Sequence, residues 1–251
     1  MKSFSAVGRL AAVLAATLLF AAPGHAWEWG TGKRITGSGV PKTETRAVSG
    51  FSGIGLSVAA NVEIRQGNAE GLSITGDDNI VALVETVVED GSLKIRWTEK
   101  NISTSYKDLK IVIDAKTIEK LSVAGSGDVH MASLKTTRLK TSIAGSGNVS
   151  ITGLAADEVD ASIAGSGSFT AGGKSKTLHV SIGGSGDLKA AKLEASEARI
   201  SIAGSGDATV WAKDKLKISV AGSGDVKYYG NPEVSKSVAG SGSAKRLGDA
   251  P

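Results

Sequence analysis

Cysteine is absent from this chain of 251 residues, which excludes disulfide bonds and a lipid-modified cysteine. Aromatic residues make up only 4% of the sequence, which is low for a surface that binds sugars or nucleic-acid bases by stacking. Neither sign of charge dominates, because 29 basic and 25 acidic residues are interspersed and give a net charge of +4 at pH 7. A nucleic-acid-binding protein has a clustered basic surface instead, so we expect no nucleic-acid partner.

Long apolar runs are also absent, apart from one at the N-terminus. Lys2 and Arg9 carry positive charge before or at the start of the apolar segment 10–22, and Gly24-His25-Ala26 offers the small residues that a signal peptidase reads. The segment is too short for a bilayer, which needs about 20 apolar residues. We therefore expect a signal peptide over 1–26, no transmembrane segment, and an exported protein in the periplasm, on the outer cell surface or outside the cell.

Glycine is abundant, with 33 residues, and much of it belongs to one repeated motif. The motif Ala/Gly-Gly-Ser-Gly occurs at intervals of 18 to 20 residues, starting at Ala124, Ala144, Ala164, Gly183, Ala203, Ala221 and Ala239. A period of this length that persists over many copies is typical of a solenoid, in which each repeat forms one coil stacked on the last.

The residues around each motif alternate between apolar and polar. Leu139, Thr141 and Ile143 precede one copy at every second position, and Val149 and Ile151 follow it. This period of two is typical of strands with one buried face. Strands that recur in every coil pair in register and in parallel, so the sequence predicts an all-β fold: a single-stranded, right-handed parallel β-helix with about 20 residues per coil.

The pattern divides the chain into four parts. After the signal peptide we expect a flexible, glycine-containing leader over 27–44, irregular β coils that cap the solenoid over 45–115, and regular repeats over 116–247. Asp90-Gly91 predicts a tight hairpin turn in the irregular part. Near the C-terminus, Lys236, Lys245 and Arg246 are expected at positions that are apolar in earlier coils, where they discourage pairing of the last strand with another chain.

Several stretches together resemble a known family, the head (GIN) domain of auto-transporter adhesins. They are segments 46–54, 61–67, 72–77 and 88–93, followed by the Ala-Gly-Ser-Gly-Asp/Asn repeats, and the resemblance spans roughly Thr45 to Lys245. It implies a secreted or envelope-associated β-helical protein. We accordingly expect a non-enzymatic, adhesin-like or structural module without a cofactor, whose partner is a surface carbohydrate or a protein. The sequence is also compatible with a homo-oligomer.

Two alternatives remain, each with its own residues. An enzyme acting on polysaccharides would use acid/base groups on neighbouring coils. The sequence aligns four such residues in one outward column, namely Asp160, His179, Arg199 and Lys217. The simpler interpretation of this column is a solvated face.

A cation-binding ladder would use a second column, which includes Asp187, Asp207 and Asp225. Side chains of this kind commonly bond backbone amides just past a turn, which is the simpler interpretation. His130 and His179 are expected on different faces, so no metal site is predicted from the histidines.

Overall fold

The computed structural model describes residues 33–99 and 101–251, so the predicted signal peptide and residues 27–32 of the predicted leader lie outside the described residues. Among the described residues, no helix has the length and apolar character needed to cross a membrane. The elements in chain order are β1 (Arg34–Thr36), β2 (Pro41–Arg46), β3 (Gly53–Leu56), β4 (Asn61–Gln66), β5 (Gly71–Asp77), α1 (Asp78–Val81), β6 (Val84–Glu89), β7 (Ser92–Trp97), β8 (Ser103–Ser105), β9 (Lys110–Ala115), β10 (Lys120–Gly125), β11 (Asp128–Gly145), β12 (Asn148–Gly165), β13 (Ser168–Gly184), β14 (Asp187–Gly204), β15 (Ala208–Gly222), β16 (Val226–Tyr229), β17 (Glu233–Gly240) and β18 (Ala244–Gly248).

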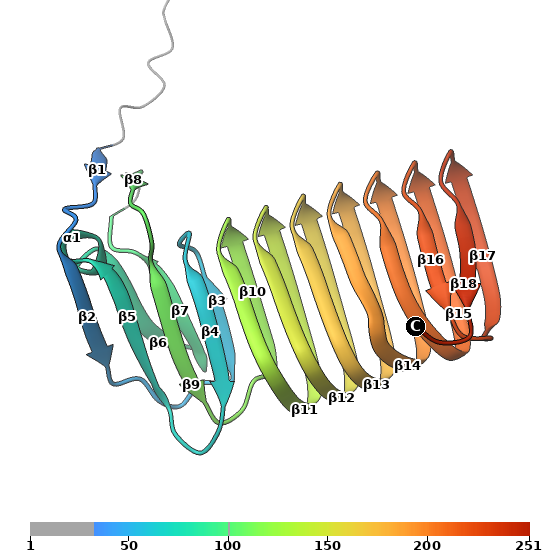
Figure 1. The fold of residues 1–251 in the computed structure, drawn as a ribbon, viewed down its shortest axis with the longest axis horizontal. Helices are drawn as coiled ribbons and strands as arrows, with labels where there is room; N and C mark the ends of the chain where they lie inside the picture. Colours follow the sequence, from blue (N-terminus) through green and yellow to red (C-terminus); the bar gives the residue numbers. More distant parts are fainter. Residues whose placement is uncertain (1–32, 100) are drawn as a thin grey trace, which may run out of the picture. The chain divides into compact units, whose positions relative to one another are not determined.

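The repeats form a β-solenoid of about six turns with roughly 20 residues per coil, as the sequence predicts. Strands β11 to β15 each follow the chain around most of one coil, and each pairs in parallel with the equivalent strand of the next coil (Figure 1). Ile163, Ile182 and Ile202 lie in register and are at most 2% exposed. Columns of equivalent apolar side chains therefore form one continuous core along these coils.

The glycines of the repeated motif make the corners possible for two different reasons. Gly204 has φ 136°, a backbone conformation that a residue with a Cβ rarely adopts. Gly206 is limited by space, because a Cβ there would clash with the carbonyl oxygen of Gly186 in the preceding coil. Identical corners stacked at strand spacing thus exclude side chains at both positions.

The N-terminal part is also a stack of strands, but its order in space differs from its order in the sequence. Strands β3 and β4 pair with β10 and β11 on one side and with β7 and β9 on the other, all in parallel. The coil that contains β3 and β4 therefore lies between two coils that follow it in the chain (Figure 1). Antiparallel pairs β2–β5, β5–β9 and β6–β7 complete this irregular end.

One boundary expected from the sequence is wrong. The described part of the predicted flexible leader contains β1, which pairs with β8, and β2, which pairs antiparallel with β5. Strand β2 is an edge strand whose residues are all exposed or half-buried, so it lacks the apolar alternation by which a strand is recognised. The hairpin turn is confirmed, because Asp90 (φ 50°) and Gly91 (φ 67°) connect β6 to β7.

The two ends of the core are covered differently. At the N-terminal end, Ile80 and Val81 of α1 are fully buried. At the C-terminal end, all eight residues of β17 are exposed, and Val234 and Val238 are 36% and 39% exposed although they align with core residues of β15.

The three basic residues near the C-terminus do not all lie where the sequence analysis expects them. Lys236 aligns with the core residue Ile218, and Arg246 aligns with Tyr228, which packs against the core. Lys245 instead aligns with Lys227, whose side chain is exposed, so the expectation of an apolar position is wrong for Lys245.

Candidate functional site

The outward side chains that precede each glycine corner form a continuous polar surface, which we call the charged face. It forms because side chains alternate along a strand, so residues between two core positions point away from the core. Parallel pairing in register then places equivalent residues of successive coils beside one another. Its three columns are Arg138, Glu158, Thr177, Glu197, Lys215 and Glu233; Lys140, Asp160, His179, Arg199, Lys217 and Ser235; and Ser142, Ser162, Ser181, Ser201, Ser219 and Ser237.

Neighbouring coils are connected across this face by ion pairs. Arg138 Nη2 lies 2.6 Å from Glu158 Oε2, and Lys215 Nζ lies 2.9 Å from Glu197 Oε1. The hydrogen bond to Glu197 and the charge of that carboxylate raise the pKa of Lys215 above its ordinary value of 10.5. Opposite charges thus meet one coil apart, although exposed pairs of this kind add little stability.

The column that contains the predicted acid/base residues is only partly brought together. His179 Nδ1 lies 3.3 Å from Asp160 Oδ1, and Arg199 is the register partner of His179 on the following strand. Lys217 is two coils away from His179, which corresponds to roughly 10 Å at strand spacing. Asp160 and His179 are therefore the one close pair among these four residues.

This face carries shallow depressions. One of about 290 Å³ is lined by residues of the column that include His179, Arg199 and Lys217, and another of about 360 Å³ includes Asp160 and His179. Both fall at or near the lower limit of the volumes typical of small-molecule sites, about 300 to 1,000 Å³. The surface thus resembles a docking face more than a substrate cleft.

The second column of candidate residues has a structural role that the geometry explains. Asp207 Oδ1 accepts a hydrogen bond of 2.8 Å from the backbone N–H of Asp225, and Asp225 Oδ1 accepts one of 2.9 Å from the N–H of Ser243. Asp187 Oδ1 makes a longer contact of 3.5 Å with the N–H of Asp207. These carboxylates cap amides of the following coil, whereas the sequence interpretation placed the amides just past the same turn.

Glu158, which was not among the residues predicted from the sequence, completes a cluster with Asp160 and His179. The three residues offer ligating atoms within 4.8 Å of one another, and each side chain is half-buried. A signal for this neighbour exists in the sequence, because Glu158 lies two residues before Asp160 and 20 residues after Arg138. Residues at those spacings share a face and a column in a solenoid of this period.

Comparison with solved structures shows that this architecture occurs elsewhere. A “putative adhesin” from Bacteroides fragilis is 30% identical, with a TM-score of 0.80, and the match covers 85% of this chain and all of the other. A “putative lipid binding protein” from Parabacteroides distasonis is also 30% identical, with a TM-score of 0.72 and coverage of 86% and 100%. A “putative adhesin” from Parabacteroides distasonis, 22% identical with a TM-score of 0.70 and coverage of 86% and 100%, shares the fold.

No curated protein matches the chain. A family model does, however, and it spans most of the solenoid and its irregular N-terminal coils. The model, described as “Putative auto-transporter adhesin, head GIN domain”, matches residues 50–232. The chain therefore belongs to the GIN domain family.

Proposed function

We propose that this protein is an exported, non-enzymatic adhesin-like module that binds a surface carbohydrate or a protein through the charged face. The observation that carries the proposal is the continuity of the three outward columns across successive coils of a tightly packed solenoid. Such a surface is rigid, because every strand that forms it is paired on both sides except at the last coil. A rigid surface loses little entropy when a partner binds.

The serine column favours an extended polar partner. Ser201 and Ser219 are exposed and are flanked by core positions on the same strands. Their short side chains let a partner approach the sheet closely, and each hydroxyl can both donate and accept a hydrogen bond. The parallel columns of charged residues beside them provide complementary contacts for charged groups of the partner.

The description of the family supports this assignment. The chain belongs to an adhesin-like family, and similar structures carry the word adhesin in their descriptions. Export is the part of the proposal that depends on the N-terminal sequence. Mass spectrometry of the mature protein should find Trp27 as its first residue, as cleavage after Ala26 requires; an intact Met1 or Lys2 at the N-terminus of the mature protein would contradict export by this signal.

The binding face can be tested by obstruction. We expect Ser201→Trp to weaken binding to glycan arrays and to intact cells of the producing organism at least tenfold, because a large ring blocks approach to the sheet. Thr209→Trp is the matched control, since Thr209 lies on a neighbouring strand in another outward column. Equal binding by both variants, or equal loss in both, would show that the partner uses a different surface.

A further inference from the structure

Three side chains on the charged face bring atoms that can ligate a metal close together. Glu158, Asp160 and His179 each place one ligating atom within 4.8 Å of the other two. The closest pair, Asp160 Oδ1 and His179 Nδ1, is 3.3 Å apart. None of the three is fully exposed, so each is held partly against the sheet.

The backbone accounts for this arrangement. Glu158 and Asp160 are two residues apart on β12, so both point to the same side of the sheet. His179 on β13 is the register partner of Asp160. Two strands that are hydrogen-bonded along their length therefore hold the three Cα atoms in place before any ligand arrives, which reduces the entropy lost on binding.

The distances suit zinc. Zinc–ligand bonds of about 2.0–2.2 Å at tetrahedral angles separate two ligand atoms by about 3.3–3.6 Å, and the Asp160–His179 distance of 3.3 Å falls in this range. Separations of up to 4.8 Å in the cluster can shorten by rotation about the side-chain bonds of Glu158. We propose that Glu158, Asp160 and His179 form a binding site for Zn²⁺, with the fourth coordination position open to solvent.

Arg138 supports the site from the neighbouring strand. Its Nε and Nη2 atoms lie 2.8 Å and 2.6 Å from Glu158 Oε2. Both contacts engage the same carboxylate oxygen, so they leave Oε1 for the metal. Ligating carboxylates in zinc sites are commonly held by such a second hydrogen-bonding partner, which orients them.

The donor set selects the type of metal. Two carboxylates and one imidazole are ligands that zinc accepts, whereas calcium and magnesium prefer six or more oxygen atoms. Lys140 and Arg199 flank Asp160 and His179 in the same column, and Glu197 lies in the column of Glu158. Together with Arg138, these neighbours carry a net charge of about +2, which offsets the two ligand carboxylates, so affinity depends on direct ligand bonds.

The sequence predicts no metal site from the histidines, because His130 and His179 are expected on different faces. The structure instead pairs His179 with carboxylates of the preceding coil, while His130 lies in another outward column beside Glu63. The proposed zinc site does not depend on the adhesin-like function. A failure of the partner-binding experiment would leave it intact, and the reverse also holds.

The site can be tested by calorimetric titration of ZnCl₂ into the purified protein, without a polyhistidine tag or chelator. We expect one zinc ion per chain. His179→Gln and Asp160→Asn should each weaken zinc affinity roughly tenfold or more. His130→Gln is the histidine control and Glu197→Gln is the carboxylate control, and both should bind zinc as the parent does.

A second measurement keeps the test decisive if a variant folds poorly. In the His130→Gln protein, zinc should shift the imidazole nitrogen signals of His179 in NMR spectra, whereas calcium or magnesium at the same concentration should not. Circular dichroism without zinc establishes that each variant is folded. The proposal is overturned if zinc leaves these signals unchanged, or if saturable binding survives unchanged in both His179→Gln and Asp160→Asn.

Discussion

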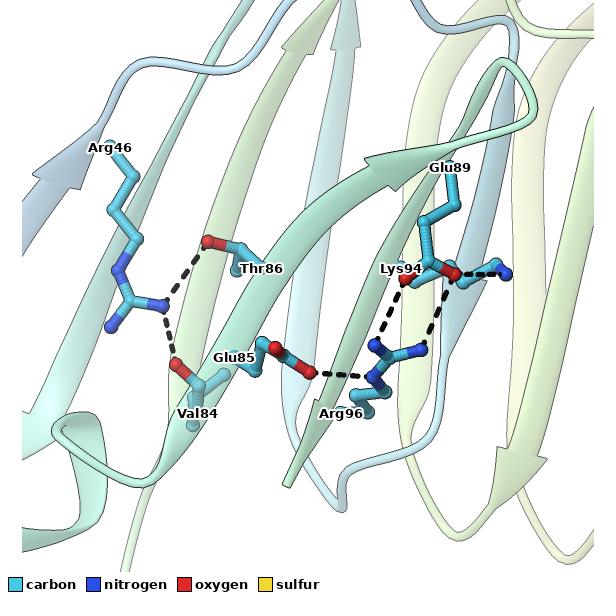
Figure 2. A network of polar contacts seen from close by, with 7 residues as sticks. All are labelled: Arg46, Val84, Glu85, Thr86, Glu89, Lys94 and Arg96. Atoms are coloured by element: carbon cyan, nitrogen blue, oxygen red, sulfur yellow. Dashed lines mark hydrogen bonds and ion pairs between the residues drawn. The ribbon is translucent and has the colours of Figure 1, made fainter. Parts of the chain in front are cut away.

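Arg46 on β2 donates a hydrogen bond from its guanidinium to the backbone carbonyl oxygen of Val84, the first residue of β6 (Figure 2). The same side chain donates to Thr86 Oγ1 at 3.2 Å and to the carbonyl oxygen of Val81 at 3.1 Å. Among the residues that the structure describes, β2 and β6 each pair along one edge only, at the N-terminal end of the stack. Arg46 thus connects two edge strands and the end of α1 with one side chain that is 17% exposed.

Arg46→Met should lower the free energy of unfolding by about 1–3 kcal/mol, because it leaves partly buried carbonyl groups without their charged donor. Urea denaturation measures the change. Arg65→Met is a matched control. Arg65 pairs with Glu63 as Arg46 pairs with Glu44, in each case a glutamate two residues earlier, but the Arg65 side chain is 56% exposed. We expect an effect of less than about 0.5 kcal/mol there, and equal effects of both substitutions would show that Arg46 has no special role.

The pH dependence of stability should reflect the ion pairs at the same end. Hydrogen bonds from Lys94 and Arg96 lower the pKa of Glu89 below its ordinary value of 4.5 (Figure 2). A lowered pKa in the folded state stabilises the protein above the pKa of the unfolded state, and this contribution is lost as the pH falls through the folded-state value. Thermal unfolding of Glu89→Gln between pH 5 and pH 3 should therefore depend less on pH than that of the parent. Glu119→Gln, at an exposed position, should retain the parental slope, and a parental slope in Glu89→Gln as well would refute the assignment.

The corners predict a sharp difference between two adjacent residues. Gly206→Ala should destabilise the protein by about 1–3 kcal/mol, since its methyl group would clash with the backbone of Gly186. Ser205→Ala should have almost no effect, because the Ser205 side chain is exposed. The midpoint of thermal unfolding distinguishes the two outcomes. Equal tolerance of both substitutions would mean that the coils do not stack as closely as described.

A stabilising substitution is available in the core. Thr141 is 1% exposed, and its hydroxyl has no hydrogen-bond partner among the described residues. Thr141→Val keeps the shape and removes the unpaired polar group, so we expect a gain of about 1 kcal/mol in the free energy of unfolding. Thr136→Val should give no such gain, because the Thr136 hydroxyl donates to the carbonyl oxygen of Arg138 at 3.1 Å. A loss of stability in Thr141→Val would indicate that the hydroxyl has a partner, such as a buried water molecule.

The exposed C-terminal edge predicts that Lys236 prevents self-association through β17. Lys236 aligns with the core residue Ile218, so a second strand added to β17 would bury its ammonium group without a partner. We expect Lys236→Ile to form dimers or larger oligomers as its concentration is raised, over a range in which the oligomeric state of the parent protein stays constant. Sedimentation velocity measures the difference. Ser235→Ile adds the same side chain at the neighbouring outward position and should not associate in this way. Identical sedimentation of Lys236→Ile and the parent would show that Lys236 is not what prevents association.

The regular coils could be predicted because each residue repeats the surroundings of its equivalent one coil earlier. Ile182 is the register partner of Ile163 and is buried like it, so one alternating pattern, repeated in each coil, defines the core. The N-terminal strands lack this redundancy, and no period reveals that β3 pairs with β7 as well as with β10.

The candidate site could be predicted only in part, for a similar reason. The repeat period aligns Asp160 with His179, but it does not show that Arg138 donates a hydrogen bond to Glu158 beside them. Which residues share a column follows from the period, whereas which side chains meet depends on the contacts between neighbouring coils.

The position of the β3–β4 coil between later coils also affects the order in which the strands can assemble during synthesis. This coil cannot acquire both of its neighbours until the chain has been made as far as β11. The first part of the domain must therefore fold as one late, cooperative unit, whereas each later coil can add to the growing end as soon as it emerges. Newly made chains that stop short of β11 would expose unpaired strand edges, which can pair with other chains and aggregate unless a chaperone covers them.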